Sequence, residues 1–339
     1  MPQENKNIRH IKNERLETVK PGYRGNKLVN GRFANGEEVY NPDFSNVLRW
    51  KLRSNPQAQE KKQDDYTPPV KHGCDFIQEK DDMVVWLGHA SFFIRLNGIT
   101  FLTDPVLYDL PMMKRRVELP CPPEQLQQID FLLLSHGHRD HLDKDSIRTV
   151  FEHNPQLKAL GPLRVGEILR GISPQLPYQE AGWYQRFDLV PGNVEVYYLP
   201  ASHWHRRGLT DMNKVLWGSF LLKTPELNLY FAGDTAMDGH FEAIQELFGP
   251  MDICIMPVGA YKPAFMMSKS HVNPHEAVRA YNLLQGGTFI PMHYGTFDLS
   301  DEPASEPVRL LEQIAAAGML RGLQLPTIGA PMLLRNLLY

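Results

Sequence analysis

Hydrophobic and polar positions are patterned differently in the first eighty residues and in the rest of the chain. Residues 1–80 are polar, show little periodicity and carry frequent Gly, Asn and Pro, and residues 54–72 are typical of a linker. From residue 81 onward, short apolar runs alternate with amphipathic stretches. We therefore predict a main domain over residues 81–339 and a partly flexible N-terminal extension over residues 1–80, of which residues 31–53 wrap the domain.

The main domain is predicted to combine strands and helices. Apolar or alternating runs predict strands at residues 83–87, 91–96, 99–103, 130–134, 194–199, 216–222, 227–232, 252–257 and 288–292. Amphipathic spacing and capping residues predict helices at residues 143–153, 162–170, 239–247, 274–285 and 305–317. Strands come first and helices are interspersed later. This order favours an α/β (α+β) fold in which two sheets pack face to face with helices outside, a four-layer αββα sandwich.

Composition adds three limits. With 339 residues, 42% of them hydrophobic, the chain can bury a large core. Its net charge of −3 gives no general attraction to nucleic acid. The three cysteines are far apart and odd in number, so we expect neither a disulfide framework nor a Cys-x-x-Cys metal site. This cysteine usage suits a reducing compartment, and Cys254 is expected in the core.

The chain is predicted to be soluble and cytoplasmic. Its start is polar and lacks the apolar region of a signal peptide. No run approaches the roughly 18–20 apolar residues that span a bilayer. Residues 1–62 contain 13 Lys or Arg against 7 Asp or Glu, a net charge of +6. Such a segment could lie on an anionic lipid surface, so peripheral contact with a membrane stays open beside the alternative of a solvated arm.

The strongest chemical signal is the segment Ser-His-Gly-His-Arg-Asp-His at residues 135–141, which follows the apolar run 131–134. Three imidazoles and one carboxylate fall within six positions at the end of a predicted strand. Neutral imidazole and carboxylate are ligands of zinc, and an open coordination position makes such a site catalytic. Four ligands so close in sequence can hardly all serve one ion, so we predict two adjacent ions.

Further ligands are expected at the ends of other predicted strands. His203, Asp234 and His293 each follow a strand-like run. The predicted cofactor is two Zn²⁺ ions per chain. The seven predicted ligands form three groups: His136, His138 and His203 for one ion, Asp140, His141 and His293 for the other, and Asp234 bridging the ions together with a hydroxide.

With these residues the chain resembles the metallo-β-lactamase superfamily, whose pattern His-x-His-x-Asp-His followed by distant His, Asp and His it matches. Longer blocks are similar to the N-acyl-phosphatidylethanolamine-hydrolysing phospholipase D family, from about residue 31 to about residue 303. These blocks include Trp86–Ala90, Leu102–Pro105, Ser202–Trp204, Asn213–Ser219, Phe231–Thr235, Pro257–Tyr261, His271–Pro274 and His293–Phe297. The resemblance implies the αββα sandwich as well.

This resemblance implies a phospholipid substrate. The expected reaction hydrolyses the bond between phosphate and N-acylethanolamine, and it yields phosphatidic acid. Ser270 stands where the mammalian enzymes are expected to carry glutamine, so substrate positioning there is expected to differ. The residues alone, without the resemblance, predict only metal-assisted hydrolysis.

Two close zinc ions can share a water, lower its pKa from 15.7 toward about 7, and stabilise charge on the attacking and leaving oxygens. Asp140 is therefore counted among the catalytic groups as well as among the ligands. His271 lies just before the predicted helix start at Pro274. Histidine is the commonest general acid or base, so His271 could protonate or hydrogen-bond a leaving oxygen. The alternative is a solvated loop histidine.

Three more residues are candidates for contact with a ligand or the substrate. Asp104 ends a predicted strand and could accept a proton from the far nitrogen of a metal-bound imidazole, or it could be a turn residue before Pro105. His89 could support a ligand or be a buried structural histidine. Arg207 follows His203 closely and could clamp a phosphate with two hydrogen bonds, or it could lie in a solvated loop.

Other functions on the same scaffold remain to be compared. A lactonase or a soluble phosphodiesterase would use the same ligands, although the blocks around Trp204, Trp217 and Tyr261 favour the phospholipase. A di-iron redox protein is disfavoured, because such proteins characteristically place glutamate where this chain has His138. Nucleic acid is not an expected partner. The sequence does not decide whether the chain forms a homodimer.

Overall fold

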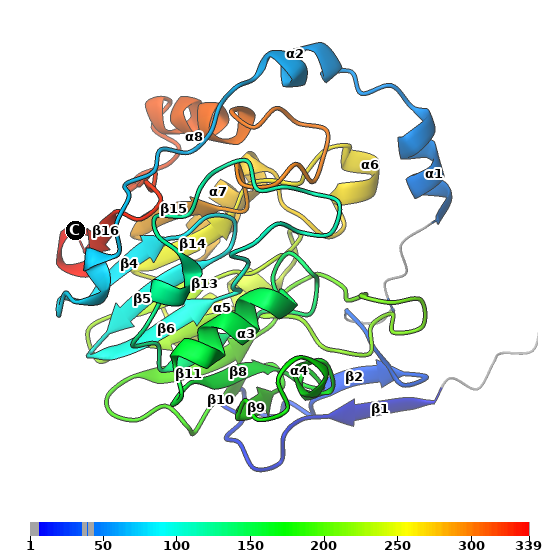
Figure 1. The fold of residues 1–339 in the computed structure, drawn as a ribbon. Coiled ribbons are helices and arrows are strands. Elements are labelled where there is room, and N and C mark those ends of the chain that lie inside the picture. The colour runs from blue at the N-terminus through cyan, green and yellow to red at the C-terminus, as the bar shows by residue number, and fades with distance from the viewer. Residues whose placement is uncertain (1–6, 36–38, 40–43, 339) are drawn as a thin grey trace, which may run out of the picture.

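Two β-sheets lie face to face in the computed structural model of the chain, which describes residues 7–35, 39 and 44–338 (Figure 1). One sheet has the strand order β16-β4-β5-β6-β7-β8-β9. Its strands are β4 (Met83–Trp86), β5 (Phe92–Leu96), β6 (Ile99–Thr103), β7 (Phe131–Leu133), β8 (Lys158–Pro162), β9 (Tyr178–Ala181) and β16 (Pro331–Leu333). The other has the order β10-β11-β12-β13-β14-β15. Its strands are β10 (Gln185–Arg186), β11 (Glu195–Leu199), β12 (Ser219–Lys223), β13 (Asn228–Phe231), β14 (Ile253–Pro257) and β15 (Thr288–Met292).

The main hydrophobic core fills the space between the sheets. Phe92 of β5 meets Phe231 of β13 edge to face, with ring centroids 6.4 Å apart. Trp86 of β4 stacks on Tyr294, which follows β15, at 5.0 Å. Every residue of β5 and of β14 is buried. Strands covered on both faces read as continuous apolar runs, which is why these strands were visible in the sequence.

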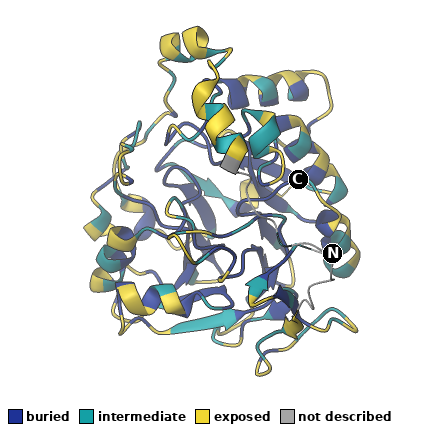
Figure 2. Cartoon of the chain, turned by 90° about the vertical axis from the view of Figure 1, so that its right-hand side faces the viewer, coloured by how far each residue is buried: buried dark blue, intermediate teal, exposed yellow. Residues whose placement is uncertain are grey.

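Helices cover the outer faces of both sheets, and Figure 2 shows their exposed residues facing outward from the buried strands. The seven-stranded sheet carries α3 (Lys144–His153) and α4 (Gly166–Ile172), which pack Ile147 and Leu169 into its second hydrophobic cluster. The six-stranded sheet carries α5 (His240–Phe248), α7 (Pro274–Leu283) and α8 (Glu306–Ala316). The predicted four-layer αββα sandwich is confirmed.

Two of these helices begin as their sequences predict. Asp143 caps α3, and its side chain accepts a hydrogen bond from the backbone nitrogen of Ser146 at 2.8 Å. Asn273 and Glu276 form a capping box at the start of α7, with Pro274 in the first turn. The predicted helix over 162–170 begins later, at Gly166, because Pro162 ends β8 and a tight turn follows.

The N-terminal residues contain more structure than predicted. β1 (Ile8–Ile11), β2 (Asn26–Val29) and β3 (Arg32–Phe33) form a small antiparallel sheet, labelled in part beside α4 in Figure 1. A linker was predicted over residues 54–72, but helix α2 (Ala58–Gln63) lies there, after α1 (Phe44–Leu52). α1 contacts the short helix α6 (Ala264–Met267), and Glu60 of α2 pairs with Arg309 of α8 at 3.1 Å. Polar contacts between distant segments therefore order a stretch that lacks apolar periodicity.

One prediction about the cysteines is wrong. The structure pairs Cys74 with Cys121 in a disulfide, with Cα atoms 5.9 Å apart. The backbone nitrogen of Gly73 donates to the carbonyl oxygen of Pro120 at 2.8 Å, so two loops that are 47 residues apart run side by side here. Such an approach is tertiary and leaves no mark in cysteine spacing. Cys254 is free and buried in β14, as predicted.

Within the described part of the chain, no helix has both the length and the apolar character needed to cross a bilayer.

Candidate metal centre

The C-terminal ends of strands from both sheets meet at one edge of the sandwich. β6 and β7 run parallel, as do β13, β14 and β15, and β11 has the direction of β13 because two antiparallel pairings separate them. All seven predicted ligands follow such ends: His136, His138, Asp140 and His141 follow β7, and His203, Asp234 and His293 follow β11, β13 and β15. Strand ends of parallel sheets are the usual place for sites in such folds.

Glycine is required immediately before Asp234. Gly233 has a φ of +59°, and a Cβ there would lie 2.9 Å from the carbonyl oxygen of Gly218 and 2.9 Å from the Cβ of Ser135. A side chain at this position would therefore be strained and would push apart the loops that carry the ligands. The block Ala-Gly-Asp thus turns the Asp234 carboxylate inward at the end of β13.

Three imidazole nitrogens converge on one point. His136 Nε2 lies 2.9 Å from His138 Nδ1, and His203 Nε2 lies 3.1 Å from the same Nδ1. Ligands about 2.0–2.1 Å from a tetrahedral zinc ion lie roughly 3.3 Å from one another. The distances between these imidazole nitrogens are close to that ligand–ligand distance. Asp234 completes this group, with Oδ2 3.9 Å from His136 Nε2 and 3.8 Å from His203 Nε2.

A second group lies on the other side of Asp234. Its Oδ2 is 3.2 Å from His141 Nε2, and its Oδ1 is 3.2 Å from His293 Nε2. Asp140 Oδ2 lies 3.7 Å from His141 Nε2 and 3.6 Å from His293 Nε2. Asp234 therefore stands between both groups, which is the position expected of a bridging ligand.

The atoms that face the centre are buried and unsatisfied. His141 Nε2, His293 Nε2 and Asp234 Oδ1 form no hydrogen bond with any described residue. Buried polar atoms are normally hydrogen-bonded, so such a cluster needs another partner. Imidazole and carboxylate donors at these spacings fit divalent cations of the zinc type. The two groups of ligands proposed from the sequence are also the two groups found in space. His89 is an additional possible ligand in the second group.

The far sides of several imidazoles are held by the protein. His141 Nδ1 lies 2.8 Å from Asp104 Oδ2, His136 Nδ1 lies 2.9 Å from Ser135 Oγ, and His203 Nδ1 lies 2.9 Å from the carbonyl oxygen of Ser270. Asp104 is fully buried and also accepts a hydrogen bond from the backbone nitrogen of Ser135 at 2.7 Å. Such partners fix the orientation and the tautomer of a ligand imidazole.

The electrostatics of the two groups differ. Burial lowers the pKa of His138 to about 3 and holds the pKa of His136 and His203 well below the usual value, so these imidazoles are neutral. Burial also acts on His293, but Asp234 and Asp140 outweigh it and raise its pKa to about 9. The pKa of Asp234 stays well below the usual value despite burial, because of the charges of His141 and His293. Neutral imidazole is the form that binds metal.

His89 and His271 lie beside the ligands. His89 is 1% exposed, its Nε2 is 3.2 Å from Asp140 Oδ2, and its ring lies over His293 with centroids 4.0 Å apart. His271 faces the cavity above the ligands, with Nδ1 3.8 Å from Asp234 Oδ2. His271 lies outside the two groups described above, although it also forms a smaller possible metal-binding group with Asp234 and His293.

Arg207 lies beneath the ligand loop rather than free in solvent. Its Nη1 donates to the carbonyl oxygen of Gly137 at 2.9 Å, to that of Leu142 at 2.8 Å, and more weakly to that of His138 at 3.5 Å. Burial and, to a smaller extent, the nearby charge of Arg139 lower its pKa to about 10. One nitrogen thus joins the two ends of the loop that carries four ligands. The solvated-loop alternative does not hold, and the guanidinium already has partners other than a phosphate.

Four of the seven predicted ligands, His138, Asp140, Asp234 and His293, line a cavity of about 710 Å³. Apolar side chains and three arginines belong to the same lining. The lining comprises Val47, Trp50, His138, Arg139, Asp140, Trp204, Arg206, Arg207, Gly208, Leu209, Asp234, Ala260, Met266, Met267, Ser270, His271, His293 and Leu299. The Met-rich stretch 261–267, which the sequence left between core and exposed loop, contributes Met266 and Met267 from α6.

Several residues of this cavity were not singled out in the sequence. Val47 and Trp50 come from α1, and Asn35 supports the ligand loop after β11: its Nδ2 donates to the carbonyl oxygen of His203 at 2.7 Å, and its Oδ1 accepts from Trp217 Nε1 at 2.9 Å. These residues lie more than 150 positions before His203. The available signal was that the resemblance to the phospholipase D family begins at about residue 31 and so includes all three positions.

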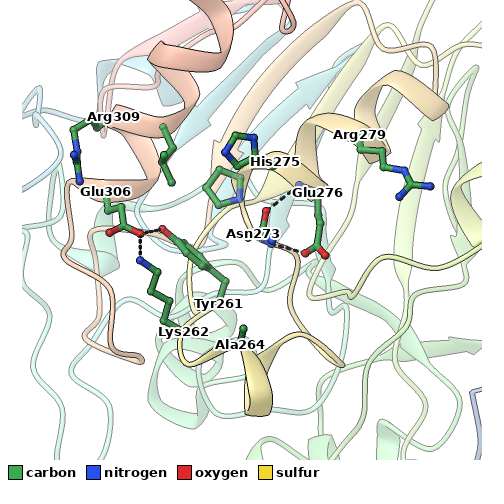
Figure 3. A pocket seen from close by; sticks show the side chains of 11 residues that line it. Tyr261, Lys262, Ala264, Asn273, His275, Glu276, Arg279, Glu306 and Arg309 are labelled. Carbon is green, nitrogen blue, oxygen red and sulfur yellow. Dashed lines mark hydrogen bonds and ion pairs between the residues drawn. The ribbon is translucent and has the colours of Figure 1, made fainter. Parts of the chain in front are cut away.

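A second cavity of about 610 Å³ lies between α6, α7 and α8 (Figure 3). Its polar groups already satisfy one another: Glu306 binds Lys262 and the hydroxyl of Tyr261, and Asn273 and Glu276 form the cap of α7. Arg279 projects away from these pairs (Figure 3). No group of potential metal ligands lies in this cavity among the described residues.

Comparison with known proteins identifies the family. The profile of the β-lactamase superfamily domain matches residues 100–294. N-acyl-phosphatidylethanolamine-hydrolyzing phospholipase D 1 of Caenorhabditis elegans is 32% identical over 295 residues, which cover 81% of this chain and 83% of the worm protein. A UPF0173 metal-dependent hydrolase of Caldivirga maquilingensis is 29% identical over 68% of this chain and 89% of its own length.

A solved structure agrees on the fold. Igni18, a metallo hydrolase from the archaeon Ignicoccus hospitalis, matches with a TM-score of 0.58 and 19% identity, over 74% of this chain and 97% of that protein. The family resemblance predicted from the sequence is confirmed. The chain is a metal-dependent hydrolase of the metallo-β-lactamase superfamily, and it belongs to the family that includes the worm phospholipase D.

Proposed function

We propose that this chain is a phospholipase D that uses two zinc ions to hydrolyse N-acyl-phosphatidylethanolamine to N-acylethanolamine and phosphatidic acid. The observation that carries the proposal is the position of Asp234 between two ligand groups, on the floor of a cavity with one apolar wall. The name and the 32% identity of the worm relative support the choice of substrate.

The ligand set favours zinc. Five imidazoles and two carboxylates make up the seven proposed ligands, and imidazole-rich sites suit zinc better than the oxygen-rich sites of magnesium or calcium. Two divalent ions held by these groups would supply Lewis acidity and an activated water to a phosphodiester. Asp140 and Asp234 would balance their charge, and Asp104 would keep the Nε2 lone pair of His141 directed at the centre.

His271 is placed to handle a proton. Burial lowers its pKa to about 4, and Asp234 opposes that effect, so at neutral pH the metal-free imidazole is uncharged. Its Nδ1 has no hydrogen-bond partner among the described residues, and the ring lines the cavity. We propose that His271 hydrogen-bonds the phosphate or the departing oxygen. A solvated histidine would instead be far more exposed than its 13% side-chain exposure.

The apolar wall is suited to lipid chains. Trp50 and Val47 of α1 face the same cavity as Met266 and Met267 of α6, and Leu209 at its edge is 91% exposed. Flexible thioether side chains adapt to chains of different length. We propose that acyl chains lie against this wall while the phosphate meets the ligand centre, with the protein in peripheral contact with a membrane.

The decisive experiment is turnover of a defined N-acyl-phosphatidylethanolamine in detergent micelles, with both products identified by mass. Activity should be lost with a chelator and restored by zinc. Asp234→Asn should lower turnover by about 100-fold or more, because even partners outside the ligand set are worth about 10- to 100-fold. Asp238→Asn, the same change on an exposed side chain four residues away, is the control.

Two results would contradict the proposal. Full zinc content and normal turnover in Asp234→Asn would rule out a bridged pair of ions. A chain that carries its metal but does not release N-acylethanolamine would have another substrate, and lactones and soluble phosphodiesters would be tested next.

A further inference from the structure

The lining of the cavity above the ligand centre contains charged as well as apolar side chains. Arg139, Arg206 and Arg207 all belong to its lining. The carboxylates in the lining are Asp140 and Asp234, and both belong to the proposed ligand groups. Bound divalent ions would neutralise these two carboxylates. The arginines would then leave the lining of the cavity with an excess of positive charge.

The three guanidinium groups are not equally available. Arg207 is occupied by the carbonyl oxygens of Gly137 and Leu142. Arg139 and Arg206 are exposed, and neither forms an ion pair with a carboxylate of a described residue. Their contacts are one 3.5 Å hydrogen bond from Arg139 Nη2 to the carbonyl oxygen of Arg207, and one 2.9 Å hydrogen bond from Arg206 Nε to that of Gly208.

Arg139 is also fixed close to the reacting groups by the chain itself. It stands between His138 and Asp140, one from each ligand group. Since Arg207 joins the two ends of this loop, the backbone that carries Arg139 is held in place. The guanidinium therefore extends from a backbone that is held in place, forms one long hydrogen bond to a carbonyl oxygen, and lines the cavity above the ligand centre.

We propose that Arg139 and Arg206 select phosphodiesters that carry a net negative charge and disfavour zwitterionic phosphodiesters, in which one ester group carries an ammonium ion. The inference rests on the proposed function and sharpens its substrate class. A phosphodiester carries one negative charge, which the amine of an ordinary ethanolamine or choline phospholipid cancels. N-acylation turns that amine into a neutral amide, so the lipid becomes a monoanion.

Charge complementarity then explains selectivity without a pocket shaped for the head group. Two guanidinium groups attract the monoanion and repel the ammonium of a zwitterion, and such repulsion is an effective means of rejecting a wrong partner. Both side chains are exposed, so each contributes modestly, about two- to fivefold, in line with exposed ion pairs. Screening by salt should reduce the discrimination, because the Debye length shortens to about 3 Å at 1 M.

The test compares two soluble chromogenic diesters that differ in net charge: bis(p-nitrophenyl) phosphate, a monoanion, and p-nitrophenyl phosphorylcholine, a zwitterion. The quantity measured is the ratio of kcat/KM for the monoanion to that for the zwitterion, on the full-length zinc-loaded protein. We expect this ratio to fall about two- to fivefold in Arg139→Gln and in Arg206→Gln, and about tenfold in the double variant. Zinc content should stay at the wild-type level.

Arg279→Gln is the matched control. It removes one positive charge from an exposed arginine that lines the separate cavity of Figure 3, and the ratio should not change. An equal fall in this variant would mean that net charge rather than the position of the arginines sets the ratio. That result would overturn the inference.

The remaining outcomes separate the inference from the proposed function. An unchanged ratio in Arg139→Gln and Arg206→Gln, together with normal turnover of N-acyl-phosphatidylethanolamine, would reject the arginine selectivity and leave the phospholipase intact. A charge preference that falls in the variants, in a protein inactive on the lipid, would keep the selectivity and reject the phospholipase. A zinc-loaded protein that hydrolyses neither diester nor the lipid would reject both.

Discussion

Three imidazoles of the metal centre are held at their far nitrogen by different partners. His141 faces a buried carboxylate, His136 a hydroxyl, and His203 a backbone carbonyl. A carboxylate partner raises the basicity of an imidazole more than a neutral partner does. The pKa of His141 is accordingly well above the usual value despite burial, because Asp234, Asp140 and Asp104 favour its charged form. The two ion sites should therefore differ in how protons compete with metal.

Metal binding should release protons from the second group. In the metal-free chain the pKa of His293 is about 9 and that of His141 is well above its usual value, so both imidazoles are protonated at pH 7.5. A metal ion must displace those protons. We expect these two imidazoles to release about two protons per chain at pH 7.5, in addition to the proton lost by a metal-bound water. Release should decline as the pH rises past about 9, and apparent affinity should weaken as the pH falls.

Titration calorimetry in two buffers of different ionisation enthalpy measures this release directly. Zinc binding to the first group provides an internal control, since His136, His138 and His203 are neutral and have no proton to lose. Heats that do not depend on the buffer at pH 7.5 would show that the second group is already deprotonated.

At the scale of elements, the loop between β7 and α3 is the part of the molecule on which the site depends most. It carries four of the proposed ligands, and α3 begins directly after it at its Asp143 cap. Arg207, from the loop after β11, donates hydrogen bonds to carbonyl oxygens at both ends of this loop. A ligand loop held at both ends loses little conformational entropy when it binds metal, because its ligands already have the required positions in the metal-free protein.

Changing Arg207 should loosen this loop. Arg207→Lys keeps the charge, but its shorter side chain does not bring a nitrogen to the position of Nη1 between the two carbonyl oxygens, and Arg207→Gln removes the charge as well. We expect a loss of about 1–3 kcal/mol in the free energy of unfolding, because buried carbonyl oxygens lose their partner. Metal affinity should fall in parallel, by about 10- to 100-fold.

Denaturant unfolding and competition with a coloured chelator measure the two effects of Arg207→Lys. Arg206→Gln is the control for stability: its side chain is exposed, and the free energy of unfolding should change by less than about 0.5 kcal/mol. Wild-type stability and zinc affinity in both Arg207 variants would mean that the carbonyl contacts are dispensable.

The elements that could be predicted from the sequence are those that leave a recognisable pattern of apolar and polar residues along the chain. β5, β14 and β15 are buried on both faces and read as apolar runs, and the ligands follow strand ends. β1 was missed because three of its four residues are exposed, and β8 because it ends in Gly161 and Pro162. Residues such as Asn35 act through contacts across more than 150 positions, and periodicity carries no trace of such contacts.

At the scale of the whole molecule, one edge of the seven-stranded sheet is tied to distant parts of the chain. β16 pairs with β4 at one edge of the seven-stranded sheet, and the segment before β4 is fastened to the loop before η2 (Pro123–Gln125) by the Cys74–Cys121 disulfide. That bond closes a loop that contains β4, β5 and β6. A covalent bond across this stretch reduces the conformational freedom of these residues in the unfolded chain.

The disulfide should contribute measurably under oxidising conditions. For a loop of this length, chain entropy gives a stabilisation of about 3–4 kcal/mol. Cys121→Ser should lower the free energy of unfolding by that amount in the absence of reductant, and wild type in reductant should behave like the variant. Cys254→Ala, which removes the free buried thiol, controls for loss of a cysteine as such. Equal stability of wild type with and without reductant would show that the bond does not form in solution.

The ligands lie on four strand ends that are scattered along the chain, and this has a consequence for how the protein is made. His136 and His293 are separated by 157 positions. At about 5–20 residues per second, a ribosome needs roughly 8–30 seconds to pass from one to the other. During that interval the nascent chain contains the four ligands of residues 136–141 before all three partner ligands, His203, Asp234 and His293, have been translated. Loading with the correct ions must therefore follow synthesis, and early capture of a stray cation by the first half of the set would compete with maturation.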